Sequence, residues 1–299
     1  MSQIDDLKLK FRTANIVVKL IVINAILFLF ARLGAWVIGT QPSALMEWFV
    51  LPAKLESLIL QVWGLLTYSF LHFDFMHIFW NMFVLYLFGQ FVLNLFTEKR
   101  FLTIYLVGAI SGGLLFVLAY NVIPVLQGQL AYLIGASAAV RAIMIFIAAY
   151  IPNTEVRLIF VNVKLWHIGV FVVLMDLIQL SGQSPETGNA GGLIAHLGGA
   201  LYGYLYAVQL KKGNDIGSGF EKFMDAVVSM FKPKKKSPLK TVHKAKKPKN
   251  TKTKGTNSSS KVKNPNQAEI DAILDKISKS GYDSLTKQEK DFLFKAGKD

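Results

Sequence analysis

Six long apolar stretches constrain the fold of this chain more than any other feature of its sequence. The hydrocarbon core of a bilayer is about 30 Å thick, and about 17–25 helical residues cross it. With 53% hydrophobic residues and a mean hydropathy of +0.40, the chain is too apolar for an ordinary soluble domain. We therefore predict an all-α membrane protein with a bundle of six transmembrane helices. The expected spans are residues 15–38, 70–95, 101–120, 136–152, 158–181 and 190–210.

Composition divides the chain into five segments. Residues 1–14 form a short N-terminal segment, and residues 15–210 hold the six-helix core. Residues 211–232 carry apolar side chains at helical spacing, which predicts an amphipathic helix on the membrane surface. Residues 233–266 are rich in lysine and lack periodicity, which predicts a disordered basic linker. Residues 267–299 predict a small helical hairpin, with a capping box at Thr286-x-x-Glu289 at the start of its second helix.

The net charge of +14 belongs almost entirely to one segment. Residues 226–268 hold thirteen lysines and no acidic residue, and the rest of the chain is close to neutral. A nucleic-acid site would need a structured basic face with interleaved aromatic residues, which this segment lacks. We therefore expect no nucleic-acid partner, and a solvated linker beside an anionic leaflet. The chain has no cysteine, so disulfides are excluded.

Lysine and arginine in the loops indicate how the helices are oriented. Alternate loops are basic, and only Lys54 lies in the opposite set, so we expect both termini on the cytoplasmic side. The second, fourth and sixth spans then run inward from the outer face. The basic loop residues are Lys8, Lys10, Arg12, Lys99, Arg100, Arg157, Lys211 and Lys212.

Polar residues near the start of these three spans should therefore meet at one depth. Ser137 opens the fourth span, His196 lies near the start of the sixth, and His77 and Asn81 lie in the first half of the second. Polar groups inside a membrane are costly, which favours a functional interpretation. A serine hydroxyl becomes a good nucleophile beside a base, so Ser137 and His196 indicate a hydrolase. Taken alone, Ser137 is typical of a helix cap or packing serine and His196 of a satisfied interior histidine; their matched depth favours the pair.

His77 and Asn81 lie four residues apart, on one helix face. With the backbone N–H of Ser137 they could stabilise an oxyanion; a hydrogen-bonded pair between helices is the alternative. A zinc site built from His72, His77 and His196 is disfavoured, because no His-Glu-x-x-His motif is present. We expect neither a metal nor a cofactor, and we expect His72 to brace the loop 39–67.

Two further features concern the surroundings of His196. Gly199 and Gly203 share a helix face with it, and Gly-x-x-x-Gly allows close helix packing. Asp176 lies near the outer end of the fifth span and could orient His196, although a structural or interfacial role is favoured.

These motifs resemble the rhomboid family of intramembrane serine proteases over about residues 10–210, in particular a bacterial type with a C-terminal cytosolic tail. The motifs that carry the resemblance are Leu71-His72-x-x-x-x-His77-x-x-x-Asn81, Gly135-Ala136-Ser137 and Ala195-His196-x-x-Gly199-x-x-x-Gly203.

The resemblance implies a six-helix fold and a catalytic pair of Ser137 and His196 without an acid. It also implies an oxyanion hole of His77, Asn81 and the Ser137 amide, with His72, Gly199 and Gly203 as structural support. The expected partners are the bilayer and single-span membrane proteins, which would be cut near the outer leaflet. The expected location is a bacterial inner membrane. The sequence does not identify a partner for the tail.

Two positions depart from the family pattern. Ala138 follows the serine where the family often has glycine, and Arg141 stands where a tyrosine usually packs on the histidine. A cation beside the pair disfavours a protonated histidine; alternatively Arg141 turns toward water or Asp176. Arg141 is the support for an alternative function, a catalytically inactive relative that binds membrane helices. A transporter or channel is a further alternative, which would need a path of paired charges through the membrane.

Overall fold

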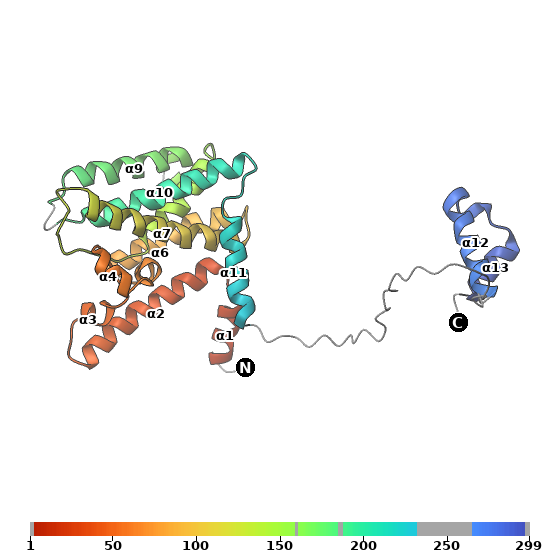
Figure 1. Cartoon of the computed structure of the whole chain (residues 1–299), viewed down its shortest axis with the longest axis horizontal. Coiled ribbons are helices and arrows are strands. Elements are labelled where there is room, and N and C mark those ends of the chain that lie inside the picture. Colours follow the sequence, from red (N-terminus) through yellow and green to blue (C-terminus); the bar gives the residue numbers. More distant parts are fainter. Residues whose placement is uncertain (1–2, 159–160, 185–187, 232–264, 297–299) are drawn as a thin grey trace, which may run out of the picture. The chain divides into compact units, whose positions relative to one another are not determined.

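The chain folds into two compact units, Met1–Lys234 and Lys235–Asp299. The computed structural model describes residues 3–158, 161–184, 188–231 and 265–296. The first unit is a helical bundle (Figure 1). Its helices are α1 (Gln3–Thr13), α2 (Ile16–Val37), α3 (Pro42–Met46), α4 (Leu55–Leu60), α5 (Gly64–Thr67), the 3-10 helix η1 (Tyr68–Phe70), α6 (Phe75–Leu93), α7 (Glu98–Val122), α8 (Ser137–Tyr150), α9 (Leu165–Ser181), α10 (Ala190–Lys211) and α11 (Ser218–Phe231).

In the part of the chain that the structure describes, two small antiparallel sheets interrupt the expected all-α architecture. β1 (Leu51–Pro52) pairs with β2 (Tyr132–Leu133), and β3 (Glu155–Leu158) pairs with β4 (Val161–Lys164). The expected span 158–181 was therefore too long at its start, because α9 begins at Leu165. In β4 the apolar residues alternate with polar ones, which is the strand pattern.

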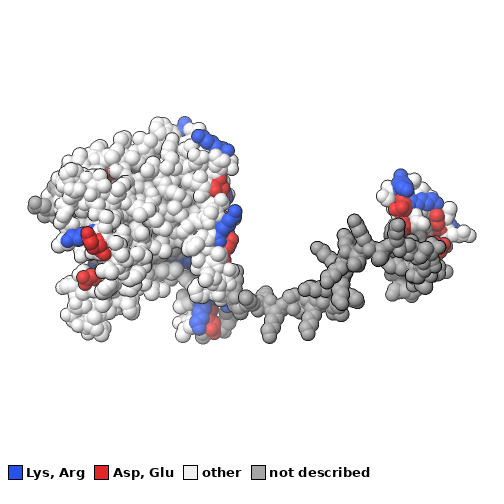
Figure 2. Space-filling model, viewed as in Figure 1, with Lys and Arg blue, Asp and Glu red and all other residues white. Residues whose placement is uncertain are grey.

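Among the described residues, three helices are long and apolar enough to cross a membrane, namely α2, α6 and α7. Two further apolar helices, α8 and α9, are shorter. Length and composition thus support three of the six expected spans. On the face seen in Figure 2, the charged side chains of the first unit gather at its two ends and leave a broad uncharged surface between them. That distribution suits a bundle surrounded by lipid.

Side-chain caps fix where the long helices begin. The side chain of Asn15 accepts a hydrogen bond from the N–H of Val18 at the start of α2, and Thr97 caps α7 in the same way. Asp74 accepts from the N–H of His77 at 2.9 Å, so α6 begins at Phe75 rather than at residue 70. The cap therefore sets the position of the histidine motif on the first turn of α6.

Glycines bring α7, α8 and α10 into backbone contact. A Cβ atom at Gly199 would overlap the carbonyl oxygen of Ala138, and one at Gly203 would overlap that of Ala142. A Cβ at Gly112 of α7 would meet the Cβ of Ala138 at 2.5 Å and the carbonyl oxygen of Ala195 in α10 at 2.7 Å. Helix α8 is consequently buried along most of its length, and it holds its first residue in a fixed position relative to α10.

Hydrogen bonds between helix ends show which ends lie together. The N–H of Ile16 at the start of α2 donates to Glu98 at the start of α7, at 3.1 Å. The ammonium of Lys211 at the end of α10 donates to the carbonyl of Ala149 near the end of α8, also at 3.1 Å. We call the end that holds the last residues of α8 and α10 the basic end. Since α8 and α10 begin at the opposite end, we call that end the site end.

Helix α11 begins at Ser218, later than the expected 211, because α10 continues to Lys211 and the chain then turns at Gly213, where φ is +86°. Asp215 fixes this turn, accepting hydrogen bonds from the hydroxyl of Tyr206 at 2.7 Å and from the N–H of Gly217 at 3.1 Å. It also forms an ion pair with Arg100 of α7. Several apolar side chains of α11 stay exposed, including Phe223, Val228 and Phe231.

The second unit contains α12 (Pro265–Ser280), the 3-10 helix η2 (Tyr282–Ser284) and α13 (Lys287–Ala296). The capping box is present, since the N–H of Thr286 donates to the Glu289 carboxylate at 2.7 Å. Lys276 of α12 pairs with the same carboxylate at 2.9 Å, which links the two helices. The expected linker 233–266 lies outside the described residues, except for its last two positions, which belong to α12.

Candidate active site

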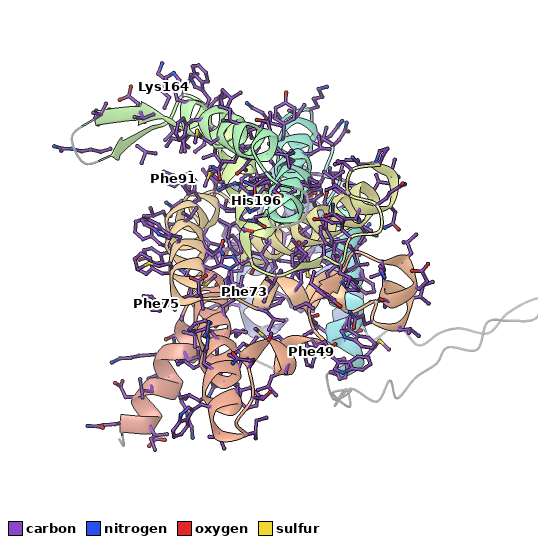
Figure 3. The ribbon with its side chains drawn as sticks, turned by 90° about the vertical axis from the view of Figure 1, so that its left-hand side faces the viewer. Phe49, Phe73, Phe75, Phe91, Lys164 and His196 are labelled. Atoms are coloured by element: carbon purple, nitrogen blue, oxygen red, sulfur yellow. The ribbon has the colours of Figure 1, made fainter. Side chains whose placement is uncertain are left out.

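A cavity of about 570 Å³ opens at the site end of the bundle. It collects residues from α6, α8 and α10, whose first turns lie together there. His196 lies in the middle of the bundle in the view from this end, whereas Phe75 and Lys164 lie at its periphery (Figure 3). The cavity is lined by Phe73, Asp74, Met76, His77, Trp80, Asn81, Val84, Ile134, Ser137, Val140, Arg141, Asn189, Gly192 and His196. All four residues expected to do chemistry thus face one space.

Ser137 is the first residue of α8, directly after a backbone conformation that needs glycine. Gly135 has a φ of +122°, and a Cβ atom there would lie 2.5 Å from Nε2 of His77. The first N–H groups of a helix have no partner within it, and the helix dipole places positive partial charge on them. The amide of Ser137 is therefore a free donor at the wall of the cavity.

His196 is held by a carboxylate from the neighbouring helix. Its Nδ1 lies 3.1 Å from Oδ1 of Asp176 in α9. A carboxylate only accepts hydrogen bonds, so it favours the tautomer with the proton on Nδ1 and leaves Nε2 as the free acceptor. A general base needs a free acceptor nitrogen, and in this tautomer Nε2 is that nitrogen.

Asp176 is bound at the same time by Arg141. The guanidinium of Arg141 donates to both carboxylate oxygens, at 2.9 Å from Nε and 3.0 Å from Nη2. The side chain of Asp176 is only 2% exposed, and a bidentate arginine is the arrangement that best compensates such a buried carboxylate. Of the two expected positions for Arg141, the structure gives the one toward Asp176.

The contact between Asp176 and His196 is the feature that sequence reasoning underestimated. A structural role was favoured for Asp176, because nothing in the sequence gives the rotation of α9 relative to α10. One feature of the sequence could have indicated this contact: Asp176 is an acidic residue in an apolar helix at the expected depth of His196, and Arg141 is expected at the same depth in α8.

His77 and Asn81 lie on the wall of the cavity contributed by α6. The side-chain amide of Asn81 donates to the carbonyl of His77 at 3.0 Å, which leaves its second N–H available. Nδ1 of His77 accepts from the N–H of Phe73 at 3.5 Å, so Nε2 is directed to the loop before Ser137.

His72 contacts a different segment from the expected one. Its Nε2 accepts a hydrogen bond of 3.5 Å from the N–H of Ala136, the residue before Ser137. Its ring packs edge-on against that of His77 at a centroid distance of 5.0 Å, and it is 1% exposed. His72 thus holds the loop before α8 in place, whereas it was expected to brace the loop 39–67.

Comparison with known proteins assigns the family. The family model of the rhomboid domain matches residues 60–213, which is more than half of the chain. The chain belongs to the rhomboid family. Rhomboids are in general intramembrane serine proteases. A second match, over residues 257–295, is to a family of unknown function (DUF6576) and includes the helical hairpin of the second unit.

Several curated rhomboids are similar to this chain. RHOMBOID-like protein 12, mitochondrial, from Arabidopsis thaliana is 32% identical over 161 residues, which cover 50% of this chain and 46% of the relative. Presenilin-associated rhomboid-like protein A, mitochondrial, from Danio rerio is 27% identical over 138 residues, or 46% of this chain and 35% of the relative. The corresponding protein from Bos taurus is 28% identical over 145 residues, or 48% and 36%. The chain thus spans less than half the length of these relatives.

These relatives correct the expected location. We predicted a bacterial rhomboid in an inner membrane, with both termini in the cytoplasm. The matched relatives are named as mitochondrial rhomboid-like proteins, and this contradicts the prediction. Sequence motifs of the site carry no information on the compartment, and the charge rule for loops orients helices without identifying the membrane.

Proposed function

We propose that this rhomboid is an intramembrane serine endopeptidase that hydrolyses peptide bonds of membrane-spanning proteins. The observation that carries the proposal is that Ser137 and His196 line one cavity while Oδ1 of Asp176 lies 3.1 Å from Nδ1 of the histidine. This arrangement supplies a nucleophile, a base and a group that orients the base.

The first half of the reaction forms an acyl-enzyme. Nε2 of His196 removes the proton from the hydroxyl of Ser137, and the oxygen attacks the carbonyl carbon of the substrate. The tetrahedral intermediate collapses when His196 passes this proton to the leaving amine. Water then repeats the sequence: His196 takes a proton from it, hydroxide attacks the ester, and the proton returns to Ser137 as the acid product leaves.

The negative charge of the tetrahedral oxygen requires donors that are already in position. The N–H of Ser137 at the start of α8 is one candidate, and the free N–H of Asn81 is a second. His77, which lies beside Gly135, is a third. Donors fixed by a helix start and by side-chain hydrogen bonds do not need to reorganise during the reaction, and this is the source of their effect.

Asp176 completes this machinery as a positioning residue. Its contact with Nδ1 fixes the tautomer of His196 and offsets the positive charge that develops on the ring during attack. Arg141 in turn orients the carboxylate through two hydrogen bonds. The proposed mechanism therefore differs from a catalytic pair without an acid, which the family resemblance implied.

The substrate proposed for this cavity is the helix of a single-span membrane protein. We propose that α2, α6, α7, α8, α9 and α10 all cross the bilayer, which places the cavity near the membrane face opposite the basic end. A helical substrate hides its carbonyl groups in hydrogen bonds, so it must unwind before attack. Segments with small or helix-breaking residues should be preferred because they unwind at lower cost.

Labelling with a fluorophosphonate tests the proposal without a known substrate. The full chain in detergent should be labelled, and Ser137→Ala and His196→Ala should not, while Ser181→Ala should be labelled like the wild type, because Ser181 is exposed at the end of α9. Unfolding midpoints check that each variant is folded. A folded wild type that resists labelling would favour an inactive rhomboid-like protein that binds membrane helices.

A further inference from the structure

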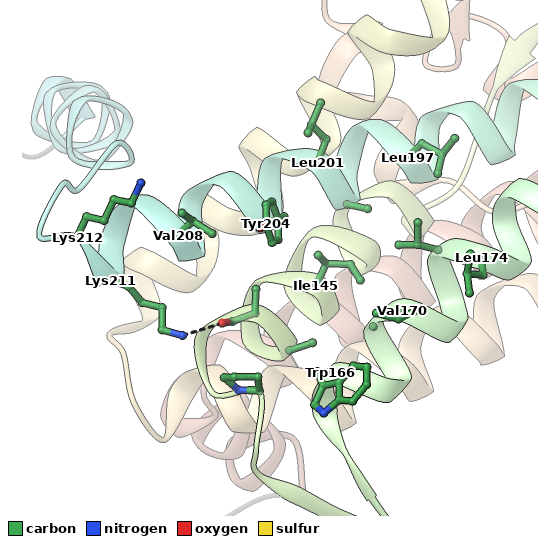
Figure 4. A pocket seen from close by; sticks show the side chains of 16 residues that line it. Ile145, Trp166, Val170, Leu174, Leu197, Leu201, Tyr204, Val208, Lys211 and Lys212 are labelled. Carbon is green, nitrogen blue, oxygen red and sulfur yellow. Dashed lines mark hydrogen bonds between the residues drawn. The ribbon is translucent and has the colours of Figure 1, made fainter.

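A second and larger cavity lies on the outside of the bundle, away from the site just described. It is a groove of about 810 Å³ between α9 and α10, with the end of α8 as its floor (Figure 4). Its walls are apolar, and several wall residues are about half exposed, including Val170, Leu174 and Leu201. With α9 and α10 crossing the bilayer as proposed above, the groove faces the acyl chains of the lipids.

One end of this groove is basic. Lys211 and Lys212, the last residue of α10 and the next one, are the charged side chains among the described residues that line it, and no acidic residue lines it. The ammonium of Lys211 donates to the carbonyl of Ala149 across the mouth of the groove (Figure 4). This contact fixes one ammonium there and leaves two of its three N–H donors free.

Trp166 indicates at which depth of the bilayer the lysine-lined end of the groove lies. It lines the groove and is 44% exposed, and its backbone N–H donates to Pro152 after the end of α8. Tryptophan is enriched where the hydrocarbon core meets the headgroups. Lys211 and Lys212 line the same groove from the end of α10, so this end of the groove lies at headgroup level, and the apolar walls run from there toward the bilayer centre.

We infer that this groove binds an anionic phospholipid, with an acyl chain along α9 and α10 and the phosphate on Lys211 and Lys212. Basic pockets between transmembrane helices bind anionic headgroups for this electrostatic reason. The ends of α8 and α10 carry negative partial charge, which disfavours an anion. The two full positive charges of Lys211 and Lys212 outweigh this negative partial charge. The site is independent of the proposed proteolysis.

Lipid titration of the full chain tests this site. Delipidated protein in detergent is titrated with phosphatidylglycerol or phosphatidylcholine, and bound lipid is counted by native mass spectrometry. Phosphatidylglycerol should bind about tenfold more tightly than phosphatidylcholine. The variant Lys211→Gln with Lys212→Gln should lose this preference. The variant Lys164→Gln with Lys222→Gln removes the same charge outside the groove and should keep it.

Either of two results of this titration would overturn the site: equal affinity of the wild type for both lipids, or an unchanged preference in the variant that lacks Lys211 and Lys212. If that variant does not fold, Val170→Trp can replace it, because it keeps both lysines and fills the groove. Retention of the bound phosphatidylglycerol by Val170→Trp would also overturn the site. Brominated phosphatidylglycerol should also quench Trp166, and this part of the quenching should be missing in Trp166→Phe. Equal quenching in both proteins would place the lipid elsewhere and reject the groove.

Discussion

Oδ1 of Asp176 in α9 lies 3.1 Å from Nδ1 of His196 in α10. We expect Asp176→Asn to lower kcat by about 10²-fold or more with little change in KM, because the amide can present its N–H to Nδ1 and favour the wrong tautomer. Proteolysis of a reconstituted single-span substrate gives both constants.

Asp215→Asn is the matched control for this prediction, since Asp215 is also paired with an arginine but lies near the basic end. It should leave kcat within about twofold of the wild type. A folded Asp176→Asn variant with the kcat of the wild type would mean that the carboxylate has only a structural role.

Asn81→Ala should reduce kcat by about 10²-fold and leave KM unchanged, because an oxyanion donor acts in the transition state rather than on the bound substrate. The corresponding control is Asn94→Ala, at the other end of the same helix and exposed. Steady-state kinetics on one substrate compare the two. A change in KM alone would assign Asn81 to substrate binding instead.

Gly199→Ala should both destabilise the protein and reduce its activity. The added Cβ would overlap the carbonyl oxygen of Ala138, and backbone atoms cannot move aside without separating α8 from α10. We expect a loss of at least about 2 kcal/mol and a lower unfolding midpoint in detergent. Gly219→Ala in α11 meets no atom within 4 Å and should leave the midpoint unchanged or raise it. Equal midpoints for the two variants would contradict the close packing.

The parts of the fold and site that depend on helix length and loop charge could be predicted from the sequence. The start of α8 at Ser137, and the presence of Ser137, His196 and His77 at one cavity, follow from the length of apolar stretches and the alternation of basic loops. Gly199 and Gly203 could be placed on one face because a helix has a fixed period. These are local properties, and each needs only a short piece of sequence.

Contacts between helices could not be predicted in the same way. The pairing of Asp176 with Arg141 and His196 depends on how three helices are rotated about their axes, which hydrophobicity does not encode. The hydrogen bond from Ala136 to His72 joins residues 64 positions apart. Strand β4 falls within the expected span 158–181, because a short apolar stretch is ambiguous between strand and helix.

Asp215 also predicts how stability depends on pH at the basic end. Burial acts to raise the pKa of Asp215, but the hydrogen bond from Tyr206 and the charge of Arg100 outweigh it, so the pKa lies below its usual value. Its contribution to stability is therefore complete above the unfolded pKa, near 4, and is lost as the pH falls through the lower folded pKa. Asp215→Asn should lower the unfolding midpoint at pH 7, and the gap to the wild type should narrow in acid. The gap between the two unfolding midpoints is measured by unfolding in detergent across this pH range. The control is Asp225→Asn, because the partner of Asp225, Lys99, is more exposed. A gap that stays constant with pH would show that the charge of Asp215 does not stabilise this turn.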